Sequence, residues 1–510
     1  MKQAETTVVR GGRVLEHQAH RAEAADLLVE GDTIREVGPP GMAAPNDAIA
    51  IDATGKLLHP GLINSHTHCH GALSKGMGDR WSLELLLTAA PWISGQRTRD
   101  DQYLAAKLNA VEMVLKGCTA AYDLFYEYPA PSLEGLEAVG RAYADVGMRA
   151  VIAPMVADAT FFSVIPGLIE VMPPDLRRQV EAFQLAPGET TLAGIARALE
   201  NWPLDPAWVR LAVAPTIPLH CSDEFMLACG RMAAEHEVGL HMHLAESKIQ
   251  ALVGMERYGE TLTAHLSRIG VLGPNFTAAH AVWLDDDDAG RIADHGGSVA
   301  HNPSSNMRLG SGLADVRAML EAGVNVGLGT DGSSCGDNQN MYEAMRLASF
   351  VSRVHGPRIE RWLTTREAVE AATVGSARAL GFGDRLGRLA PGFQADLVLL
   401  DLGHVNWLPL NDPTNQLVHV EDGNAVHSVM IGGRMVVENR RLTMVDVADL
   451  ARRAEAARAR LAEATRPMRE LYERLEPVVG TFCSALASRP YHVRRFAAHD
   501  DPHDHRRNDQ

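Results

Sequence analysis

The stretch Pro60-Gly61-Leu62-Ile63-Asn64-Ser65-His66-Thr67-His68 joins a turn, an apolar strand and two histidines. The Pro-Gly pair marks a break in the chain, and Leu62–His68 is then predicted to be a β-strand. Side chains alternate along a strand, so His66 and His68 share one face near its carboxyl end. Two imidazoles placed in this way suit zinc or iron(II). One such pair is weak evidence for a metal site, so further ligands must be found elsewhere in the chain.

From Leu62 onward, short strand-like segments alternate with long helical ones such as Asp101–Lys116 and Leu133–Val146. This pattern indicates βα units on a parallel sheet, and eight such units close a (β/α)8 TIM barrel, an α/β fold. The active site of a barrel forms at the carboxyl ends of its strands. The eight predicted strands are Leu62–His68, Thr119–Leu124, Arg149–Met155, Val209–Pro215, Val238–Glu246, Phe276–Leu284, Gly297–Asn302 and Val324–Asp331.

Sequence typical of β structure flanks the barrel on both sides. Runs such as Ala25–Glu30 precede it, and Ala395–Leu400 and Ser428–Ile431 follow a last helical segment, Thr365–Leu380. We therefore expect a second, small β domain made from both chain ends. The predicted division is 1–59 and 386–445 for this domain, 60–385 for the barrel, 446–496 for a helical extension and 497–510 for a disordered tail.

Three segments within this division are not regular βα units. Residues 157–208 exceed a normal βα connection, and they form either an active-site lid or a structural excursion. Val447–Glu463 has helical spacing, which Pro467 interrupts. The polar tail carries His499, His503 and His505, which could bind metal adventitiously, although its composition favours disorder.

Composition excludes several classes of function. The 510 residues carry a formal net charge of -16, which disfavours binding to nucleic acid. No run of about 18 apolar residues predicts a transmembrane helix, and the first ten residues lack the apolar core of a signal peptide, so we expect a cytoplasmic protein. Six scattered cysteines without a CxxC pair predict neither a disulfide framework nor a thiolate zinc site.

Further metal-capable residues lie at the predicted strand ends. His243 is near the end of the fifth strand, with Glu246 three positions later; His280 is near the end of the sixth, and Asp331 is at the end of the eighth. Singly, each has an ordinary structural explanation, and His241 is interpreted as a buried strand histidine. Together with the pair on the first strand, they indicate one site at the carboxyl ends of strands one, five, six and eight.

These features come with a set of longer motifs. The chain resembles the amidohydrolase superfamily over about residues 5–445, in the branch of cytosine, guanine, adenosine-type and triazine deaminases. The resemblance implies a metal-bearing barrel beside a β-sandwich made from both chain ends. Its motifs are Pro60–His68, His243-Leu244-Ala245-Glu246, His301-Asn302-Pro303-Ser304-Ser305-Asn306, Gly329-Thr330-Asp331-Gly332 and Pro391-Gly392-Phe393-Gln394-Ala395-Asp396-Leu397-Val398.

The resemblance implies a role for each site residue. Glu246 corresponds to the acid/base that moves a proton from the metal-bound water to the substrate, and His280 to the residue that orients the water or polarises the substrate. Asp331 can relay a second proton. Dinuclear relatives use a lysine at the end of the fourth strand, where this chain reads Ala212–Thr216, so we expect one ion, zinc or alternatively iron(II). The implied metal ligands are His66, His68, His243 and Asp331.

The implied function is hydrolytic deamination of an aminated N-heterocycle of the purine, pyrimidine, pterin or triazine type, with a metal-bound hydroxide as nucleophile. Hydrolysis of an amide, urea, carbamate or carbon–halogen bond at the same mononuclear site is the alternative. A non-enzymatic binding protein on a retired barrel is disfavoured, because retirement should erode the ligands and this set is complete. The expected partners are a small-molecule substrate and other copies of the chain, in a dimer or tetramer.

Two positions depart from the nucleoside-deaminating members of the family. Those members carry a glutamate for the ribose hydroxyls where this chain has Ile93, and a histidine for the purine where it has Thr216. Loss of the carboxylate removes a hydrogen bond worth about 1.5–3 kcal/mol, which disfavours a nucleoside and favours a flatter, less polar substrate. Trp81, Trp92 and Ile93 are candidate apolar walls. The predicted substrate contacts are Trp92, Thr216 and Asn306.

Overall fold

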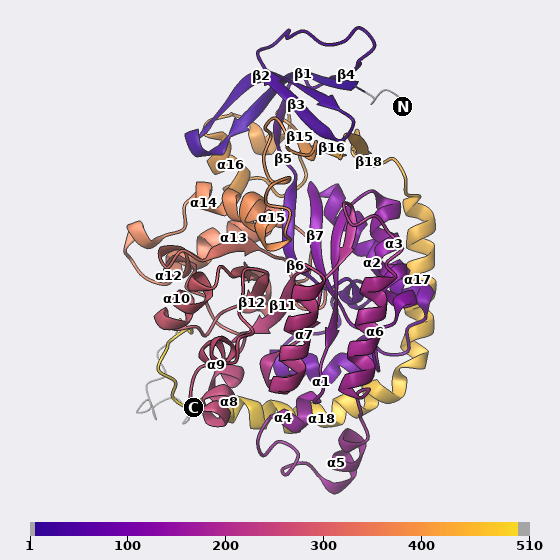
Figure 1. The fold of residues 1–510 in the computed structure, drawn as a ribbon, viewed down its shortest axis with the longest axis vertical. Coiled ribbons are helices and arrows are strands. Elements are labelled where there is room, and N and C mark those ends of the chain that lie inside the picture. Colours follow the sequence, from indigo (N-terminus) through magenta and orange to yellow (C-terminus); the bar gives the residue numbers. More distant parts are fainter. Residues whose placement is uncertain (1–5, 498–510) are drawn as a thin grey trace.

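The computed structural model describes residues 6–497. Its centre holds two parallel sheets, and a strand lies at each of the eight predicted positions (Figure 1). The fourth predicted strand is split into two short strands. One sheet contains β6 (Leu62–Thr67), β7 (Cys118–Phe125), β8 (Arg149–Val156), β9 (Val209–Leu211) and β10 (Ala214–Pro215), and the other contains β11 (Leu240–Leu244), β12 (Phe276–His280), β13 (Ser298–His301) and β14 (Asn325–Leu328).

The two parallel sheets meet at both of their edges. A parallel bridge pairs Val213, between β9 and β10, with Leu240 of β11. At the opposite edge, the amide of Asp331, just beyond β14, donates to the carbonyl oxygen of His66 in β6 at 3.0 Å. Side chains at the carboxyl ends of β6, β11 and β14 are therefore brought close to one another.

Helices that follow the strands cover the sheets, and local sequence signals set their ends. A capping box of Thr98 and Asp101 begins α2, and Gly147, at a φ of 82°, ends α3. The helices of this part are α1 (Leu83–Ile93), α2 (Arg99–Leu115), α3 (Leu133–Val146), α7 (Asp223–Glu235), α8 (Lys248–Tyr258), α9 (Leu262–Ile269), α10 (Asp286–Asp294), α11 (Pro303–Arg308), α12 (Val316–Glu321) and α13 (Met341–Val354). Short 3-10 turns occur at η1 (His17–Ala19), η2 (Cys69–Ser74), η3 (Pro218–His220), η4 (Ile359–Arg361) and η6 (Val405–Trp407).

The helix predicted over residues 365–380 forms in three pieces. These are α14 (Thr365–Glu370), a π-helical turn η5 (Ala371–Gly375) and α15 (Ser376–Ala379). A Cβ at Gly375 would collide with the carbonyl oxygen of Val326 in β14. Glycine therefore lets the widened turn pack directly on the strand backbone.

Both chain ends contribute to one mixed sheet of nine strands, which is drawn at the top of Figure 1. The β-sandwich that we expected stays a prediction; hydrogen bonds connect all nine strands in one sheet. At a bulge between Val9 and Gly12, β1 changes its parallel neighbour from β4 to β5. A Cβ at Gly12 would crowd the side chain of Leu58. The strands are β1 (Thr6–Glu16), β2 (Arg21–Glu30), β3 (Thr33–Gly38), β4 (Ile49–Asp52), β5 (Lys56–Pro60), β15 (Leu397–Asp401), β16 (Val426–Ile431), β17 (Arg434–Glu438) and β18 (Arg441–Leu442), with α16 (Pro413–His419) beside them.

The remaining segments wrap around the outside of the parallel sheets. Residues 157–208 contain α4 (Phe161–Val164), α5 (Pro174–Glu181) and α6 (Gly188–Glu200). Near the C-terminus, α17 (Val447–Ala464) packs along α2, and α18 (Arg466–Ala487) packs against α1 (Figure 1). Pro467 lies in the first turn of α18, where a missing amide hydrogen costs nothing. The histidines at 499, 503 and 505 lie outside the described residues.

Two further features of the fold concern membrane-spanning helices and disulfide bonds. Within residues 6–497, no helix is both long and apolar enough to cross a membrane. All six cysteines are buried and unpaired.

A buried ion pair connects the parallel sheets to the nine-stranded sheet. Arg149, at the start of β8, places its Nε 3.1 Å from Oδ2 of Asp396, just before β15, and both side chains are 3% exposed. The guanidinium also lies 4.2 Å from the ring centre of Trp208, and Oδ1 of Asp396 accepts from the amide of Gly432 at 2.7 Å. Each charge is therefore well compensated while the pair is intact.

Replacing Asp396 with alanine is expected to lower the free energy of unfolding by about 3–5 kcal/mol, because it leaves the Arg149 charge buried without its partner. Denaturant unfolding followed by circular dichroism measures this. Arg35→Ala, which removes the exposed pair with Glu30, should change stability by about 1 kcal/mol at most. Similar losses in the two variants would show that the buried pair contributes no more than a surface pair.

Candidate metal centre and active site

Four predicted ligands converge at the carboxyl ends of three strands. His66 is in β6 and His68 directly follows it; His243 is in β11, and Asp331 lies three residues beyond β14. Nε2 of His68 is 3.2 Å from Nε2 of His243 and 3.2 Å from Oδ1 of Asp331. Nε2 of His66 is 3.6 Å from the same carboxylate oxygen. The structure thus places all four side chains around one point.

The hydrogen bonds of two rings fix where their protons are. Nδ1 of His68 lies 2.7 Å from the carbonyl oxygen of Leu124, and Nδ1 of His243 lies 2.8 Å from that of Thr216. A carbonyl only accepts, so each Nδ1 carries the hydrogen and each Nε2 presents a bare lone pair. Two lone pairs 3.2 Å apart repel each other unless a cation lies between them. His66 Nε2 is also buried and has no hydrogen-bond partner among the described residues, so this donor set fits a divalent metal ion.

His241, expected to be a buried strand histidine, is completely buried. Its Nε2 lies 3.2 Å from Nδ1 of His66, and its ring contacts Tyr122 edge-on at 4.5 Å between centres. His241 therefore supports the orientation of His66 from within the core, as hydrogen-bond partners of metal ligands commonly do.

The electrostatics of the cluster match the protonation states that a metal ion requires. Burial, together with neighbouring His68, lowers the pKa of His243 to about 3. Burial alone would raise the pKa of Asp331, but His68 and His280 lower it to about 2. At neutral pH His243 is therefore neutral and Asp331 is ionised, as metal ligation requires.

His280 and Glu246 lie beside the four ligands. Nε2 of His280 is 3.7 Å from Oε2 of Glu246 and 3.7 Å from Oδ2 of Asp331. Burial, with Asp331 and Glu84 nearby, raises the pKa of Glu246 well above its ordinary value, so this carboxyl can hold a proton near neutral pH. The three predicted catalytic residues thus lie next to one another.

Asn306 has a different place from the one predicted. Its Oδ1 lies 2.8 Å from Nδ1 of His280, and it is not among the described residues that line the cavity over the metal centre. It is therefore a positioning partner of His280, and the structure does not support a direct substrate contact.

Three residues of the site adopt left-handed backbone conformations that non-glycine residues rarely take. The φ angles are 49° at Ala245, 70° at His280 and 61° at Asp331. Each costs about 1–3 kcal/mol and persists only where the surroundings enforce it. The amide of Trp283 donates to the Ala245 carbonyl at 2.9 Å, and that of Asp331 to the His66 carbonyl at 3.0 Å. These bonds hold the turns that carry Glu246, His280 and Asp331.

The C-terminal segment after α18 braces the same loops. Arg495 donates from Nε to the carbonyl of Val282 at 2.8 Å and from Nη2 to that of Leu284 at 2.6 Å. The amide of Leu313, in the loop beyond Asn306, donates to the carbonyl of Arg495 at 2.7 Å. One residue far along the chain therefore ties the loop after His280 to the loop after Asn306.

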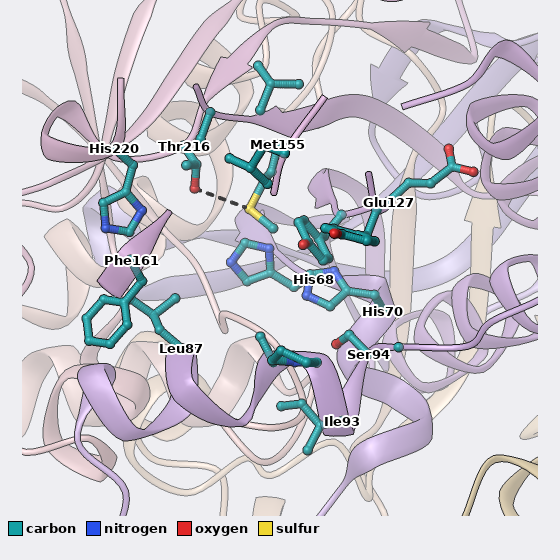
Figure 2. Close-up of a pocket in the computed structure, with 18 of the residues that line it drawn as sticks. His68, His70, Leu87, Ile93, Ser94, Glu127, Met155, Phe161, Thr216 and His220 are labelled. Carbon is teal, nitrogen blue, oxygen red and sulfur yellow. Dashed lines mark hydrogen bonds between the residues drawn. The ribbon is translucent and has the colours of Figure 1, made fainter. Parts of the chain in front are cut away.

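A cavity of about 590 Å³ opens onto the metal centre. Figure 2 shows the side chains that surround it, including Thr216, whose hydroxyl faces the sulfur of Met155 at 3.8 Å. Thr216 and Ile93 both line the cavity, as do Phe161, Phe162 and Phe183 of the segment 157–208. That segment is therefore part of the cavity wall and not an excursion away from the site.

Trp92 is not among the described residues that line the cavity. Its ring lies 5.5 Å from Tyr472 of α18 and 6.1 Å from Trp81. Pro91 and Ile93, its neighbours in α1, line the cavity, whereas Trp92 packs against α18. The structure therefore gives no support to Trp92 as a substrate contact.

Several residues of the site were missed in the sequence. His70 lines the cavity, and its ring is 5.2 Å from that of His68; a third alternate histidine after His66 and His68 was a signal that could have found it. Arg97 and His220 also line the cavity, and Glu84 of α1 accepts from Ser247 at 2.8 Å. They come from helices and loops, where no short motif marks them.

Comparison with known proteins agrees with this geometry. The model of the amidohydrolase family matches residues 57–436. A 5′-deoxyadenosine deaminase from Methanothermobacter thermautotrophicus is 31% identical over 461 residues, covering 90% of this chain and 99% of that protein. An adenosine deaminase from Xanthomonas campestris with bound zinc aligns with a TM-score of 0.79 and 26% identity, over 89% of this chain and 98% of that chain. A mutant atrazine chlorohydrolase from Arthrobacter aurescens, complexed with zinc and atraton, aligns with a TM-score of 0.79 and 27% identity, over 89% and 100% of the two chains.

The family match spans well over half of the chain, and the motifs that carried the predicted resemblance lie inside or at the edge of it. The predicted class of enzyme is confirmed by relatives that are named deaminases. The chain belongs to the amidohydrolase family and is a hydrolase that acts on C–N bonds other than peptide bonds.

Proposed function

We propose that this enzyme hydrolytically deaminates an aminated N-heterocycle of the purine, pyrimidine, pterin or triazine type, using one divalent metal ion. The observation that carries the proposal is the pair of bare imidazole nitrogens of His68 and His243, 3.2 Å apart, with Glu246 placed outside the ligand set. Zinc is the ion we favour, because solved structures of similar proteins contain it, and iron(II) is the alternative.

Each residue has a definite task in this reaction. His66, His68, His243 and Asp331 would hold the ion, which when bound lowers the pKa of a water molecule from ~15.7 towards ~7. Glu246 would take a proton from the water and deliver it to the ring nitrogen or to the leaving amine, and the proton that Asp331 accepts would pass on to the departing nitrogen, which leaves as ammonia. His280 presents Nε2 to the same space and is held by Asn306 through Nδ1. Asp331, ionised at neutral pH, accepts the second proton.

The cavity wall supports a substrate with few hydroxyl groups. Ile93 and Thr216 line the cavity, and neither replaces the carboxylate or the imidazole of nucleoside-deaminating members. The similar proteins named above include nucleoside deaminases, so a purine ring lies within the proposed class of substrate. This chain, however, has no carboxylate at position 93 to bind the hydroxyls of a ribose.

Hydrolysis of a carbon–halogen bond is the second candidate, and one observation favours it. The chain aligns over 89% of its length with an atrazine chlorohydrolase. Both reactions replace a substituent on an electron-poor ring carbon with oxygen from water, so the same metal centre supports either.

The larger organisation of the chain enters the proposal as well. We infer that the two parallel sheets close as a (β/α)8 barrel, since they meet at both edges. The composite domain of residues 1–59 and 386–445, the barrel of 60–385, the extension of 446–496, a dimer or tetramer of the chain and a cytoplasmic location all stay predictions.

Metal removal tests the centre. Chelation is expected to abolish turnover and zinc to restore it, with about one ion bound per chain, measured by mass spectrometry of the metal content. His243→Ala should lose the ion because a ligand is missing, whereas His241→Ala should lower zinc affinity by about 10–100-fold through the misplaced His66 ring. His295→Ala, at the end of α10, is the control. Full zinc binding by His243→Ala would contradict the assignment.

Glu246→Gln tests proton transfer. The variant is expected to keep its metal, because Glu246 is not a ligand, and to lose about 10²–10⁴-fold in kcat. Steady-state kinetics beside metal analysis separates these effects. Glu256→Gln, on an exposed position of α8, should behave as the unmodified enzyme. An unchanged kcat in Glu246→Gln would remove this residue from the chemistry.

The identity of the product separates the two candidate reactions. Matched triazines and pyrimidines that carry either an amino or a chloro substituent are offered to the zinc-loaded enzyme, and free ammonia and chloride are measured. We expect ammonia, because Glu246 can protonate an amine, which is a poor leaving group until protonated. Chloride release without ammonia would favour dehalogenation.

A further inference from the structure

Arg97 lies in the wall of the cavity, four residues after the end of α1. Among the described residues that line the cavity, it is the only arginine or lysine. Its Nη2 donates to the carbonyl oxygen of Ile93 at 2.9 Å. Nε and Nη1 are shielded from solvent and find no acceptor within residues 6–497. Those two nitrogens carry three of the five N–H groups of a guanidinium, so most of its hydrogen-bonding capacity is unused.

The charge of Arg97 is not neutralised by nearby acids. Burial lowers its pKa to about 10, which still leaves it protonated at neutral pH. Asp101 acts on it from a distance, but its carboxylate already accepts from Thr98 and Arg460. Arg97 is only partly exposed, and a charge in such surroundings is unfavourable without a partner, so an anion in the cavity would provide the missing partner.

Glu127, an acid that also lines the cavity, is engaged elsewhere. Its carboxylate accepts from Arg99 and from the amide and hydroxyl of Ser132. Figure 2 shows Glu127 across the cavity from Ile93. It pairs with Arg99 and forms no ion pair with Arg97 among the described residues.

Arg97 gives the part of the cavity around Ile93 a positive charge, where nucleoside-deaminating members of the family have a negative one. The carbonyl that anchors it belongs to Ile93, which stands where nucleoside-deaminating members carry a glutamate for sugar hydroxyls. This chain therefore has a cation beside the place where those members have an anion. A cation at this position does not repel an acidic group of the substrate, and it cannot bind sugar hydroxyls as a carboxylate does.

We propose that Arg97 binds a carboxylate carried by the heterocyclic substrate. This inference rests on the proposed function, because it describes the substrate of that same site. Guanidinium and carboxylate are both planar and form paired hydrogen bonds, so Arg97 fits this anion better than a lysine would. His70, whose ring is 5.2 Å from that of His68, lines the same cavity and links the metal end to this wall.

Two probes of the same shape test the anion subsite without turnover. Benzoate carries a carboxylate, and benzamide is its uncharged counterpart. Calorimetric titration of the zinc-loaded enzyme is expected to give at least tenfold tighter binding of benzoate. Arg97→Gln should lose this preference, Arg97→Lys should keep part of it, and Arg35→Gln, which removes an exposed ion pair outside the cavity lining, should keep all of it.

Two results would overturn the proposal: no preference for benzoate in the unmodified enzyme, or an undiminished preference in Arg97→Gln, since the metal ion would then be the anion's site. Metal content and circular dichroism establish that each variant is folded.

Substrates provide the second readout. The ratio of kcat/KM for 4-aminopyrimidine-5-carboxylate to that for 4-aminopyrimidine should fall at least tenfold in Arg97→Gln, and an unchanged ratio would contradict the proposal. If neither compound releases ammonia, the proposed deamination of pyrimidines fails, while the benzoate titration still decides the role of Arg97.

Discussion

Two imidazole nitrogens that face each other with bare lone pairs impose the main constraint on this molecule. Nε2 of His68 and Nε2 of His243 are 3.2 Å apart, and both rings are held in this tautomer by backbone carbonyls, those of Leu124 and Thr216. Such an arrangement is stable only around a cation. The rings come from the ends of β6 and β11 and the carbonyls from β7 and the residue after β10, so the parallel sheets bring all four groups to one point. The metal ion is therefore expected to stabilise the fold as well as to serve the chemistry.

The second constraint is the strained backbone from which the acid/base groups project. Parallel register pairs Leu244 with His280, so regular alternation would turn His280 to the face opposite His243. The left-handed conformation of His280 ends the strand and brings its ring to 5.5 Å from that of His243. Hydrogen bonds from Trp283 and from Arg495 hold the loop that follows. A segment near residue 495 thus contributes to the geometry of a site whose first ligand is residue 66.

The parts of the site that could be predicted from sequence are those set by strand periodicity and barrel topology. His66, His68, His243 and Asp331 lie at strand ends, and the fold brings such ends together. Asn306 could not be placed, because its partner is created by the unusual turn at His280. The position of Trp92 depends on α18, which packs against α1 from almost 400 residues away in the chain. In the same way, the bulge at which β1 changes its parallel neighbour lies where Gly12 packs against Leu58, a contact between strands that the sequence alone does not show.

The distribution of charge within the cavity explains why the metal centre alone does not define the substrate. The metal end combines neutral imidazoles with the carboxyl groups of Glu246 and Asp331, a set that can activate water against many electron-poor carbons. The wall contributed by Phe161 and Phe162 is apolar and discriminates mainly by size. Discrimination by orders of magnitude requires a buried polar group that the wrong substrate leaves unpaired. Arg97 is such a group, and within residues 6–497 its guanidinium is anchored by one hydrogen bond, to the carbonyl of Ile93. Specificity in this enzyme therefore depends on the corner beside α1, where the chain departs from nucleoside-deaminating members of its family.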